Sequence, residues 1–545
     1  MAAILDSVIV GTFDYPVSKQ AAVAQLSSKR DGTYGEFQRN TYKIEGERLD
    51  LAQLLNWNVK RYTGLASQFN VFEMPSLGAH ILADNLMKNG LSAKVVNLLP
   101  NQGAYLEDLL RSKPRTVAIT TTYYVTPEPI RRVVQLVRQC SPQTKIIVGG
   151  PYIYNASASH SPAELNLLLR HIGADVYIID SQGEKTLVQV VKQIKGNPLG
   201  LAFVPNIAYQ DGSGKSWSRT PRVAESNNLD ELCVDWKRFD SLPFPKVAYM
   251  RTARSCPFKC AFCNYPAMSG EHVITSDEPL IAEMRQLQEL GAEYLIVTDD
   301  TFNVPLPRFK RLLQRMIAEG FRFRWISFFR CSNVDTEALD LMAESGCLAV
   351  YLGVESGDER ILKAMNKYAT AEQYRKGMFE LHRRGIMTFG SFIIGYPGET
   401  EDSVRNTFAF IEETKPRYYN AQLYFHNPIS PIHARREEFQ IEGQHYSWRH
   451  RTMDWNGGSY WTNWLLKNVT NSIQLPLYGF SIWSIPYLLV HGFRLDQIER
   501  FSRSAQRIML QGLDDGLEQY DAEFGAIRDV LAEWRPAPVL AELSH

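Results

Sequence analysis

The chain has 545 residues, of which 45% are hydrophobic and 22% are charged, so a wholly disordered polypeptide is excluded and several domains are expected. Lys and Arg total 59 and Asp and Glu total 59, a zero balance that argues against a protein that grips nucleic acid through a strong positive field. The opening residues have no basic stretch before an apolar one, so we predict no signal peptide and a cytoplasmic protein. The longest apolar window, 472–493, is interrupted by two prolines and a histidine, which favours a buried helical hairpin over a membrane span.

Residues 1–70 are predicted to form an N-terminal extension with a strand at 8–12 and a short hairpin near 42–49. From 71 to 204, strand patterns alternate with helical ones. We expect strands at 93–96, 116–122, 145–148 and 175–179, and helices at 76–89, 105–111, 129–140, 162–172 and 181–195, the last opened by a capping box from Ser181 to Glu184. This alternation predicts a parallel, doubly wound, Rossmann-like α/β domain.

Ligands of doubly wound domains bind at the carboxyl ends of the strands. Here those ends carry a hydroxyl-rich segment and a glycine pair, namely Thr120, Thr121, Thr122, Tyr123, Gly149 and Gly150. Glycine lets a backbone approach a ligand closely, and hydroxyl groups can bond to its polar edges. The alternative is an ordinary doubly wound domain that binds nothing.

A second βα series follows a predicted linker at 205–245, which is rich in Gly, Ser and charged residues and suggests a small hairpin. The six strands are expected at 248–252, 294–298, 323–328, 349–353, 388–394 and 420–425, with helices between them. This order predicts a partial (β/α)6 barrel over 246–435. The last segment, 436–545, is rich in tryptophan and is predicted to be a mostly helical C-terminal domain.

Three of the seven cysteines, Cys256, Cys260 and Cys263, fall within eight residues just after the first barrel strand. The spacing is C-x3-C-x2-C. Three thiolates at this spacing can bind three irons of a [4Fe-4S] cluster and leave the fourth iron open to a chelating cofactor. A structural zinc ion requires four closed ligands, and no fourth Cys or His follows closely. The sequence therefore favours a cluster over a zinc site or a chance grouping.

This motif, placed after the first strand of a six-stranded partial barrel, resembles that of the radical S-adenosylmethionine (SAM) superfamily. The resemblance covers about residues 245–430. It implies that SAM chelates the open iron and is cleaved to a 5′-deoxyadenosyl radical. It also implies that Phe262 is the aromatic residue beside the adenine.

Further cofactor contacts follow from the same resemblance. Asp299 or Asp300, after the second strand, is expected to hold the methionyl amine; a pair of helix N-cap residues is the alternative. Glu355 and Ser356, after the fourth strand, correspond to the ribose contacts, although Glu355 also fits a buried salt bridge. Gly395, after the fifth strand, corresponds to the adenine-side glycine segment, and a tight βα turn explains it equally well.

An α/β layer ahead of such a barrel resembles the cobalamin-binding subclass of the superfamily. In this interpretation Thr120 to Tyr123 and the Gly149–Gly150 pair line the corrin and its nucleotide tail. Many cobalamin proteins carry Asp-x-His-x-x-Gly, whose histidine binds cobalt, but no histidine of this chain has Asp two residues before it. We therefore predict cobalamin bound without a protein histidine on cobalt.

The predicted function is a cobalamin-dependent radical SAM methyltransferase that methylates an unactivated centre of a small molecule or peptide. The segment from Gly35 to Leu49 and the Trp-rich C-terminal region are loosely similar to natural-product methyltransferases, including those for tryptophan and phosphinates. A flavodoxin or ferredoxin is the electron donor expected from the family. Two alternatives stay open: a cyclisation, rearrangement or oxidation with the same cofactors, and a non-catalytic cobalamin or iron–sulfur sensor.

Overall fold

The structure is a computed structural model that describes residues 4–12, 30–65, 69–210, 217–225, 227–239, 246–476, 481–513 and 520–537. It divides into two compact units. The first comprises Met1–Tyr15, Phe72–Phe244 and Val273–Leu287, and the second comprises Pro16–Val71, Pro245–His272 and Gln288–His545. This division differs from the predicted domain boundaries, because the first strand belongs to the α/β unit whereas residues 30–65 belong with the barrel.

The first unit is built on a seven-stranded sheet with the order β4-β1-β5-β6-β7-β8-β9. Its strands are β1 (Ser7–Thr12), β4 (Ala93–Leu98), β5 (Thr116–Thr120), β6 (Lys145–Gly149), β7 (Val176–Ile178), β8 (Ile207–Gln210) and β9 (Trp217–Arg219). The first five are parallel, and β8 and β9 are antiparallel additions. The predicted linker thus contributes two strands to this sheet; the turn of its hairpin lies outside the described residues.

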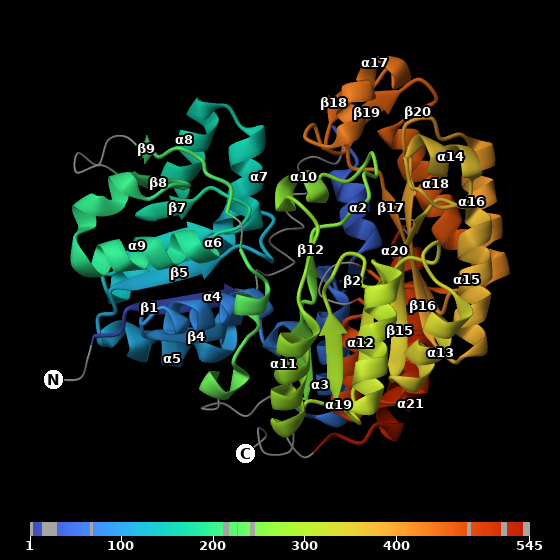
Figure 1. Ribbon diagram of the computed structural model, residues 1–545. Coiled ribbons are helices and arrows are strands. Elements are labelled where there is room, and N and C mark those ends of the chain that lie inside the picture. The colour runs from blue at the N-terminus through green and yellow to red at the C-terminus, as the bar shows by residue number, and fades with distance from the viewer. Residues whose placement is uncertain are drawn as a thin grey trace. The chain divides into compact units, whose positions relative to one another are not determined.

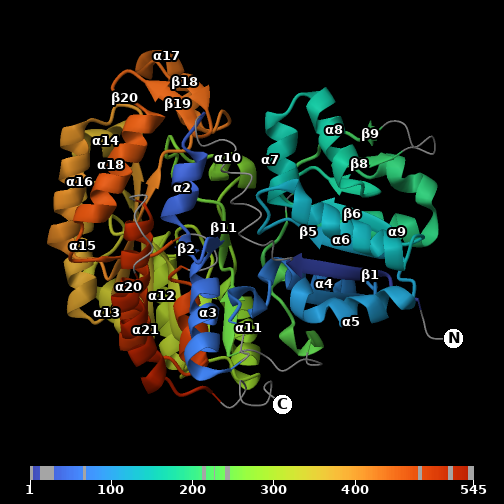
Figure 2. The ribbon, with the colours of Figure 1, turned by 180° about the vertical axis from the view of Figure 1, so that it is seen from behind.

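Helices cover both faces of this sheet, as Figures 1 and 2 show. Side chains of a strand alternate between faces, so Val8 and Val10 pack into one core and Ile9 into the other. One face carries α4 (Leu77–Lys88) and α9 (Glu184–Gly196). The other carries α5 (Leu99–Arg111), α6 (Pro127–Cys140), α7 (Pro151–Ser159) and α8 (Pro162–Ile172). The predicted doubly wound fold is confirmed.

The capping box predicted at Ser181 is wrong, because α9 begins three residues later. Its N-cap is Gly183, which makes no side-chain cap bond. The Ser181 hydroxyl instead donates to Asp180, 3.4 Å away, and Asn227 donates to the Glu184 carboxylate at 2.8 Å. Both partners that a capping box needs are therefore occupied elsewhere. The remaining elements of the unit are η2 (Pro198–Phe203), η3 (Asp230–Leu232), η4 (Trp236–Phe239), β12 (Val273–Ile274) and α11 (Asp277–Glu289).

The second unit contains an open, all-parallel sheet with the order β10-β13-β14-β15-β16-β17-β21. The strands are β10 (Val247–Met250), β13 (Tyr294–Val297), β14 (Arg324–Phe329), β15 (Cys347–Glu355), β16 (Met387–Ile394), β17 (Tyr418–Leu423) and β21 (Ile473–Gln474). The helices of this unit between them are α10 (Tyr265–Ser269), α12 (Leu306–Ala318), α13 (Thr336–Glu344), α14 (Glu359–Ala364), α15 (Ala371–Arg383) and α16 (Glu401–Thr414). All six predicted barrel strands are present, and β21 is a seventh.

The apolar window 472–493 forms a strand and one helix where the structure describes it, which corrects the predicted helical hairpin. Ile473 and Leu475 are buried beside β17, so the start of the window extends the sheet. Other C-terminal elements are η5 (Pro431–Arg435), α17 (Arg436–Phe439), β18 (Glu442–Gln444), β19 (Ser447–His450), β20 (Met453–Asp454), α18 (Trp455–Asn468), α19 (Ser484–Val490), α20 (Leu495–Gly512) and α21 (Asp521–Glu533). Helices α18 to α21 agree with the predicted mostly helical C-terminal region, which also contains the short strands β18 to β21.

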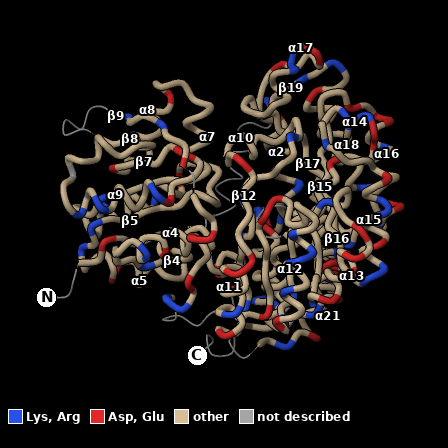
Figure 3. The backbone as a smooth tube through the Cα atoms, viewed as in Figure 1, with Lys and Arg blue, Asp and Glu red and all other residues tan. Residues whose placement is uncertain are grey.

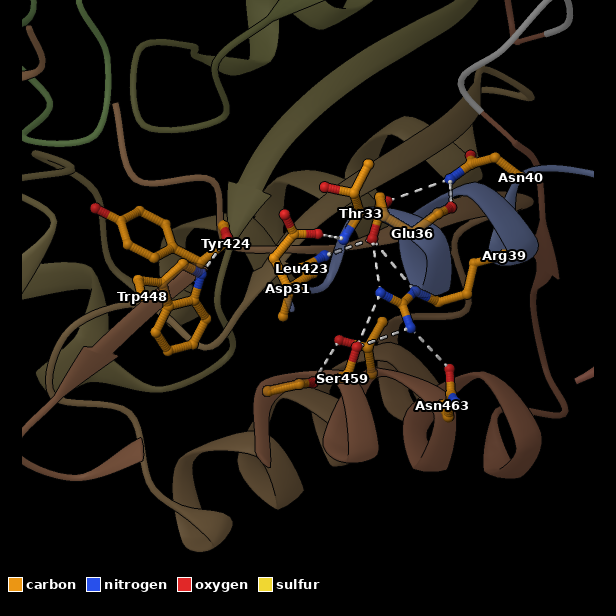
Figure 4. A network of polar contacts seen from close by, with 12 residues as sticks. Asp31, Thr33, Glu36, Arg39, Asn40, Leu423, Tyr424, Trp448, Ser459 and Asn463 are labelled. Carbon is orange, nitrogen blue, oxygen red and sulfur yellow. Dashed lines mark hydrogen bonds and ion pairs between the residues drawn. The ribbon is translucent and has the colours of Figure 1, made fainter. Parts of the chain in front are cut away.

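Residues 30–65, which precede most of the first unit in the sequence, also pack in the second unit. They form α2 (Thr33–Arg39), the antiparallel hairpin of β2 (Tyr42–Ile44) and β3 (Glu47–Leu49), and α3 (Leu51–Thr63). Figure 4 shows the buried ion pair of Glu36 and Arg39, whose atoms are 3.0 Å apart. Arg39 also donates to Asn463 of α18 at 3.0 Å, and the Leu423 N–H at the end of β17 donates to Glu36 at 3.2 Å. Helix α2 therefore joins β17 to α18.

Basic and acidic residues are interspersed along both units, as Figure 3 shows. Within the described ranges, no helix is both long and apolar enough to cross a membrane.

Candidate functional site

The cysteine motif lies in a loop that follows β10 and the short strand β11 (Ala253–Arg254). Ser255, just before the motif, has a positive φ of 68° and donates through its hydroxyl to the Gly270 carbonyl at 2.6 Å. Cys260 is buried, and Cys256 and Cys263 are partly buried. Burial raises the pKa of Cys256 and raises that of Cys263 to about 11, and each of these two thiols interacts electrostatically with Cys260. The three thiols therefore share one partly buried loop.

Backbone hydrogen bonds from two distant segments hold this loop. The Ala261 N–H donates to the Met365 carbonyl at 2.7 Å, and the Ala261 carbonyl accepts from Ile432 at 2.8 Å. The Asn366 side chain donates to the Lys259 carbonyl at 2.8 Å. The loop is thus fixed by the residues after α14 and by the start of η5.

The donor set fits a [4Fe-4S] cluster better than a single metal ion. In the described part of the chain, no group of three or more His, Cys, Asp or Glu side chains converges on a single-ion site. A zinc ion draws its sulfur ligands to about 2.3 Å from one centre, whereas each thiolate of a cluster binds a different iron. Three cysteines on one loop, with no fourth ligand beside them in the motif, match the second arrangement.

Asp299 and Asp300 follow β13, but their environments differ. Asp299 is buried, and its carboxylate accepts the backbone N–H groups of Thr252 and Ala253 at 2.7 and 2.9 Å and the Thr252 hydroxyl. It therefore fastens the connection that leads into the cysteine loop. Asp300 is exposed and interacts with Tyr265; desolvation by its surroundings, with the nearby Asp299 charge, raises its pKa to about 7. Of the two, Asp300 has the carboxylate open to a ligand.

Glu355 ends β15 with a positive φ of 71° and forms a buried ion pair with Lys367, 3.0 Å away. Burial lowers the pKa of Lys367, but Glu355, Tyr374 and Cys260 together raise it, and the net pKa lies above its usual value. The Lys367 amine lies 5.4 Å from the centroid of the Phe262 ring. The salt bridge that the sequence left open for Glu355 is therefore present, and it lies beside the predicted adenine-side aromatic residue.

Ser356 and Gly395 both have structural partners. The Ser356 hydroxyl is buried, 3.2 Å from that of Thr407, and accepts the Asp358 N–H at 3.1 Å. Gly395 has a φ of 88°, and a Cβ atom there would lie 2.6 Å from the Trp448 ring. Its N–H donates to the buried carboxyl of Glu399, whose pKa burial raises to about 8. The turn reading of Gly395 thus has direct support.

Two basic residues beside the cysteine loop were missed by the sequence analysis. They are Lys367 and Arg330, which follows β14 and is 4% exposed. The Arg330 guanidinium lies 3.7 Å from the centroid of the Phe258 ring, inside the cysteine motif. The signal available in the sequence was the position of Arg330 at the carboxyl end of a barrel strand.

The residues predicted in the first unit gather at one edge of its sheet. The Thr120 and Thr122 hydroxyls are 3.0 Å apart, and the Thr121 hydroxyl donates to the Gly149 carbonyl at 2.9 Å. Gly150 has a φ of 110° that other residues rarely adopt. Tyr123, which is 42% exposed, packs edge-on against Phe72.

This edge of the sheet corresponds to the position at which ligands bind in sheets of related topology. The parallel core has the order β4-β1-β5-β6-β7, that is, second strand, first, third, fourth, fifth. In such sheets the strand order reverses between the first and third strands, and ligands bind at their carboxyl ends. Here these are the ends of β1 and β5, where Thr12 and Thr120 lie. Exposed Tyr123 and Val125 add apolar surface to the same edge.

A doubly wound unit and a parallel barrel with a cysteine loop define the class of protein. Residues 250–411 match the model of the Radical SAM superfamily, so this chain carries a radical SAM domain, which binds a [4Fe-4S] cluster and SAM. An uncharacterised methyltransferase of Pyrococcus horikoshii is 27% identical over 357 residues, covering 62% of this chain and 73% of that protein. The anaerobic magnesium-protoporphyrin IX monomethyl ester cyclase of Cereibacter sphaeroides is 24% identical over 343 residues, covering 61% of this chain and 54% of the cyclase. The chain thus spans about half of the cyclase.

Solved structures show the same fold across both units. The radical SAM methyltransferase TsrM of Kitasatospora setae, with cobalamin and a [4Fe-4S] cluster bound, matches with a TM-score of 0.61 and 16% identity, covering 84% of this chain and 96% of TsrM. The cobalamin-dependent SAM radical enzyme OxsB matches with a TM-score of 0.54 and 16% identity, covering 87% of this chain and 77% of OxsB.

Proposed function

We propose that this chain is a cobalamin-dependent radical SAM methyltransferase that acts on an unactivated centre of a small molecule or peptide, in natural-product biosynthesis. The observation that carries the proposal is the union, in one chain, of a C-x3-C-x2-C radical SAM domain and a doubly wound sheet whose ligand edge is lined by hydroxyls and glycines. TsrM, which has this fold, is a methyltransferase and was solved with tryptophan bound. That likeness supports a small-molecule substrate.

The residues at the sheet edge fit a large cofactor with polar and apolar parts. Thr120 and Thr122 supply hydroxyls, Gly150 brings the backbone to the edge, and Tyr123 and Val125 present apolar surface. Residues 11–29, 120–126 and 149–151, which follow or end these strands, contain no histidine. We therefore propose that cobalamin binds here without a protein histidine on cobalt.

When bound, the cluster with SAM would supply a carbon radical and cobalamin a methyl group. The chain's own residues would position them: Cys256, Cys260 and Cys263 would hold the cluster, Phe262 would lie along the adenine, and Asp300 would accept a hydrogen bond from the methionyl amine. Glu355 and Ser356 would act by shaping the ribose side, since both already have protein partners. A flavodoxin or ferredoxin would deliver the electron.

The test is anaerobic purification with iron, sulfide and hydroxocobalamin, followed by metal quantification and turnover with SAM, a reductant and candidate substrates. The proposal expects about four irons and one cobalt per chain. It also expects 5′-deoxyadenosine and S-adenosylhomocysteine together with a product heavier by one methyl group. Product formation with 5′-deoxyadenosine but without added methyl would favour the cyclase-type reaction, for which the likeness to the Cereibacter sphaeroides enzyme is the supporting observation. Binding of both cofactors without SAM cleavage would favour a sensor.

A further inference from the structure

Two buried cations lie against the two phenylalanines of the cysteine loop. Arg330 is 3.7 Å from the centroid of Phe258, and Lys367 is 5.4 Å from that of Phe262. In the sequence these rings alternate with the cluster cysteines, as Cys256-Pro-Phe258-Lys-Cys260-Ala-Phe262-Cys263. Cations over aromatic faces are attracted by the ring quadrupole, and more strongly where water is excluded. Both contacts therefore bring positive charge to the loop that holds the cluster.

The two cations are not equally neutralised. Lys367 is paired with Glu355 at 3.0 Å. Arg330 is 4% exposed, and its Nε donates to the Ser332 hydroxyl at 3.1 Å, but its buried Nη2 has no hydrogen-bond partner. Among the described carboxylates, none forms an ion pair with Arg330. Because a buried charge without a counter-charge is costly, an anion beside Arg330 would stabilise this arrangement.

The cluster that Cys256, Cys260 and Cys263 would hold is a negatively charged group of this kind. Three thiolates on a [4Fe-4S] core leave the assembly negative, and reduction adds one more electron. Lys367 already interacts electrostatically with both Cys260 and Arg330. A fixed positive charge beside the cluster stabilises its reduced form more than its oxidised form, since the reduced form is more negative.

We propose that Arg330 is a positioning residue that seats the cysteine loop through Phe258 and raises the reduction potential of the cluster. Lys367 contacts the second ring, Phe262, but its charge is neutralised by Glu355, so it adds little net charge beside the cluster. The inference rests on the proposed function only through the cluster of the radical SAM domain. It is independent of cobalamin and of the substrate.

The experiment is a redox titration of the reconstituted full chain without SAM or cobalamin. The electron paramagnetic resonance signal of the reduced cluster is measured at each potential. The variants are Arg330→Gln, which removes the charge, and Arg330→Lys, which keeps it. The control is Arg405→Gln: Arg405 also lies over an aromatic ring, 4.9 Å from Trp464, but on the exposed face of α16.

At the potential that half-reduces the wild type, Arg330→Gln is expected to lower the ratio of reduced to oxidised cluster about tenfold, which equals about 59 mV for a one-electron couple. Arg330→Lys is expected to recover most of this shift, and Arg405→Gln to show none. Equal potentials for the wild type and Arg330→Gln, at equal iron content, would overturn the proposal. If Arg330→Gln retains no iron, the titration is done with Phe258→Leu instead. This variant keeps the charge of Arg330 but removes the aromatic ring against which its guanidinium lies. A smaller shift in the same direction supports the proposal, and no shift overturns it.

If neither the wild type nor the variants bind iron, the radical SAM assignment itself fails. That outcome is recognised before any potential is measured. Iron without cobalt would leave the inference intact while removing the methyl-transfer part of the proposed function.

Discussion

Single residues decide how the cysteine loop is held, and Asp299 is the clearest case. Its buried carboxylate accepts two backbone N–H groups and one hydroxyl from Thr252 and Ala253. We expect Asp299→Asn to destabilise the protein by about 1–3 kcal/mol. The amide NH2 of asparagine would face the N–H and hydroxyl donors that the carboxylate binds, so a buried donor would lose its acceptor. Urea unfolding and iron content measure the effect. Asp300→Asn is the control, since Asp299 and not Asp300 accepts the Thr252 and Ala253 N–H groups, and equal losses in both variants would contradict this role.

Gly395 is a second position where one atom matters. A Cβ there meets Trp448 at 2.6 Å and the residue has a φ of 88°. Gly395→Ala is therefore expected to lower stability by the left-handed backbone cost, about 1 kcal/mol, plus an overpacking cost of about 1–3 kcal/mol. Gly385→Ala separates the two costs, because Gly385 has a φ of 70° but no atom within 4 Å of its Cβ position. Equal thermal shifts in the two variants would show that Trp448 yields without cost.

The buried salt bridge of Glu355 could be predicted from the sequence, and Arg330 only from its place at the carboxyl end of a barrel strand, whereas Lys367 could not. A motif such as C-x3-C-x2-C is local, so its spacing alone indicates the chemistry. Lys367 lies in the segment Met-Asn-Lys-Tyr, which has no comparable pattern. It reaches Phe262 only because residues 365–366 bind the loop backbone after folding.

At the scale of elements, helix α2 packs against the barrel strand β17 and helix α18. Glu36 and Arg39 form a buried pair three residues apart, and Glu36 also accepts the Leu423 N–H. Glu36→Gln should cost about 3–5 kcal/mol, because it leaves a buried guanidinium without its counter-charge. The double variant Glu36→Gln/Arg39→Met is expected to recover part of the loss.

Thermal unfolding measures both variants. The matched control is Glu438→Gln, because Glu438 pairs with Arg435 at the same spacing on the surface, at 2.5 Å. Exposed pairs contribute little, so no measurable change is expected there. If Glu36→Gln lowers stability no more than the control does, the network of Figure 4 does not stabilise the fold.

Elements with strong alternation were predictable, and those set by tertiary partners were not. Apolar strand patterns located β1, β4 to β7, β10 and β13 to β17, whereas β8 and β9 fall in the predicted linker and β21 was not expected. The capping box failed because Asn227, distant in sequence, binds Glu184. The window 472–493 was misread because an apolar run alone does not distinguish a buried strand from a helix, and pairing with β17 determined its first part.

At the scale of the whole molecule, the two proposed cofactor sites belong to different units and are expected to be lost separately. Replacing Cys256, Cys260 and Cys263 by Ser should remove iron while cobalamin is retained. Gly78→Leu should do the reverse, because a Cβ there already lies 3.5 Å from the Thr122 hydroxyl, so a larger side chain fills the sheet edge. Gly103→Leu, on α5 with no atom within 4 Å of its Cβ position, is the control that leaves both cofactors in place. Iron and cobalt per chain are measured after anaerobic reconstitution. Loss of cobalt in the cysteine variant would mean that the sheet edge does not hold cobalamin by itself, whereas retention of cobalt in Gly78→Leu would place cobalamin away from Thr120 and Thr122.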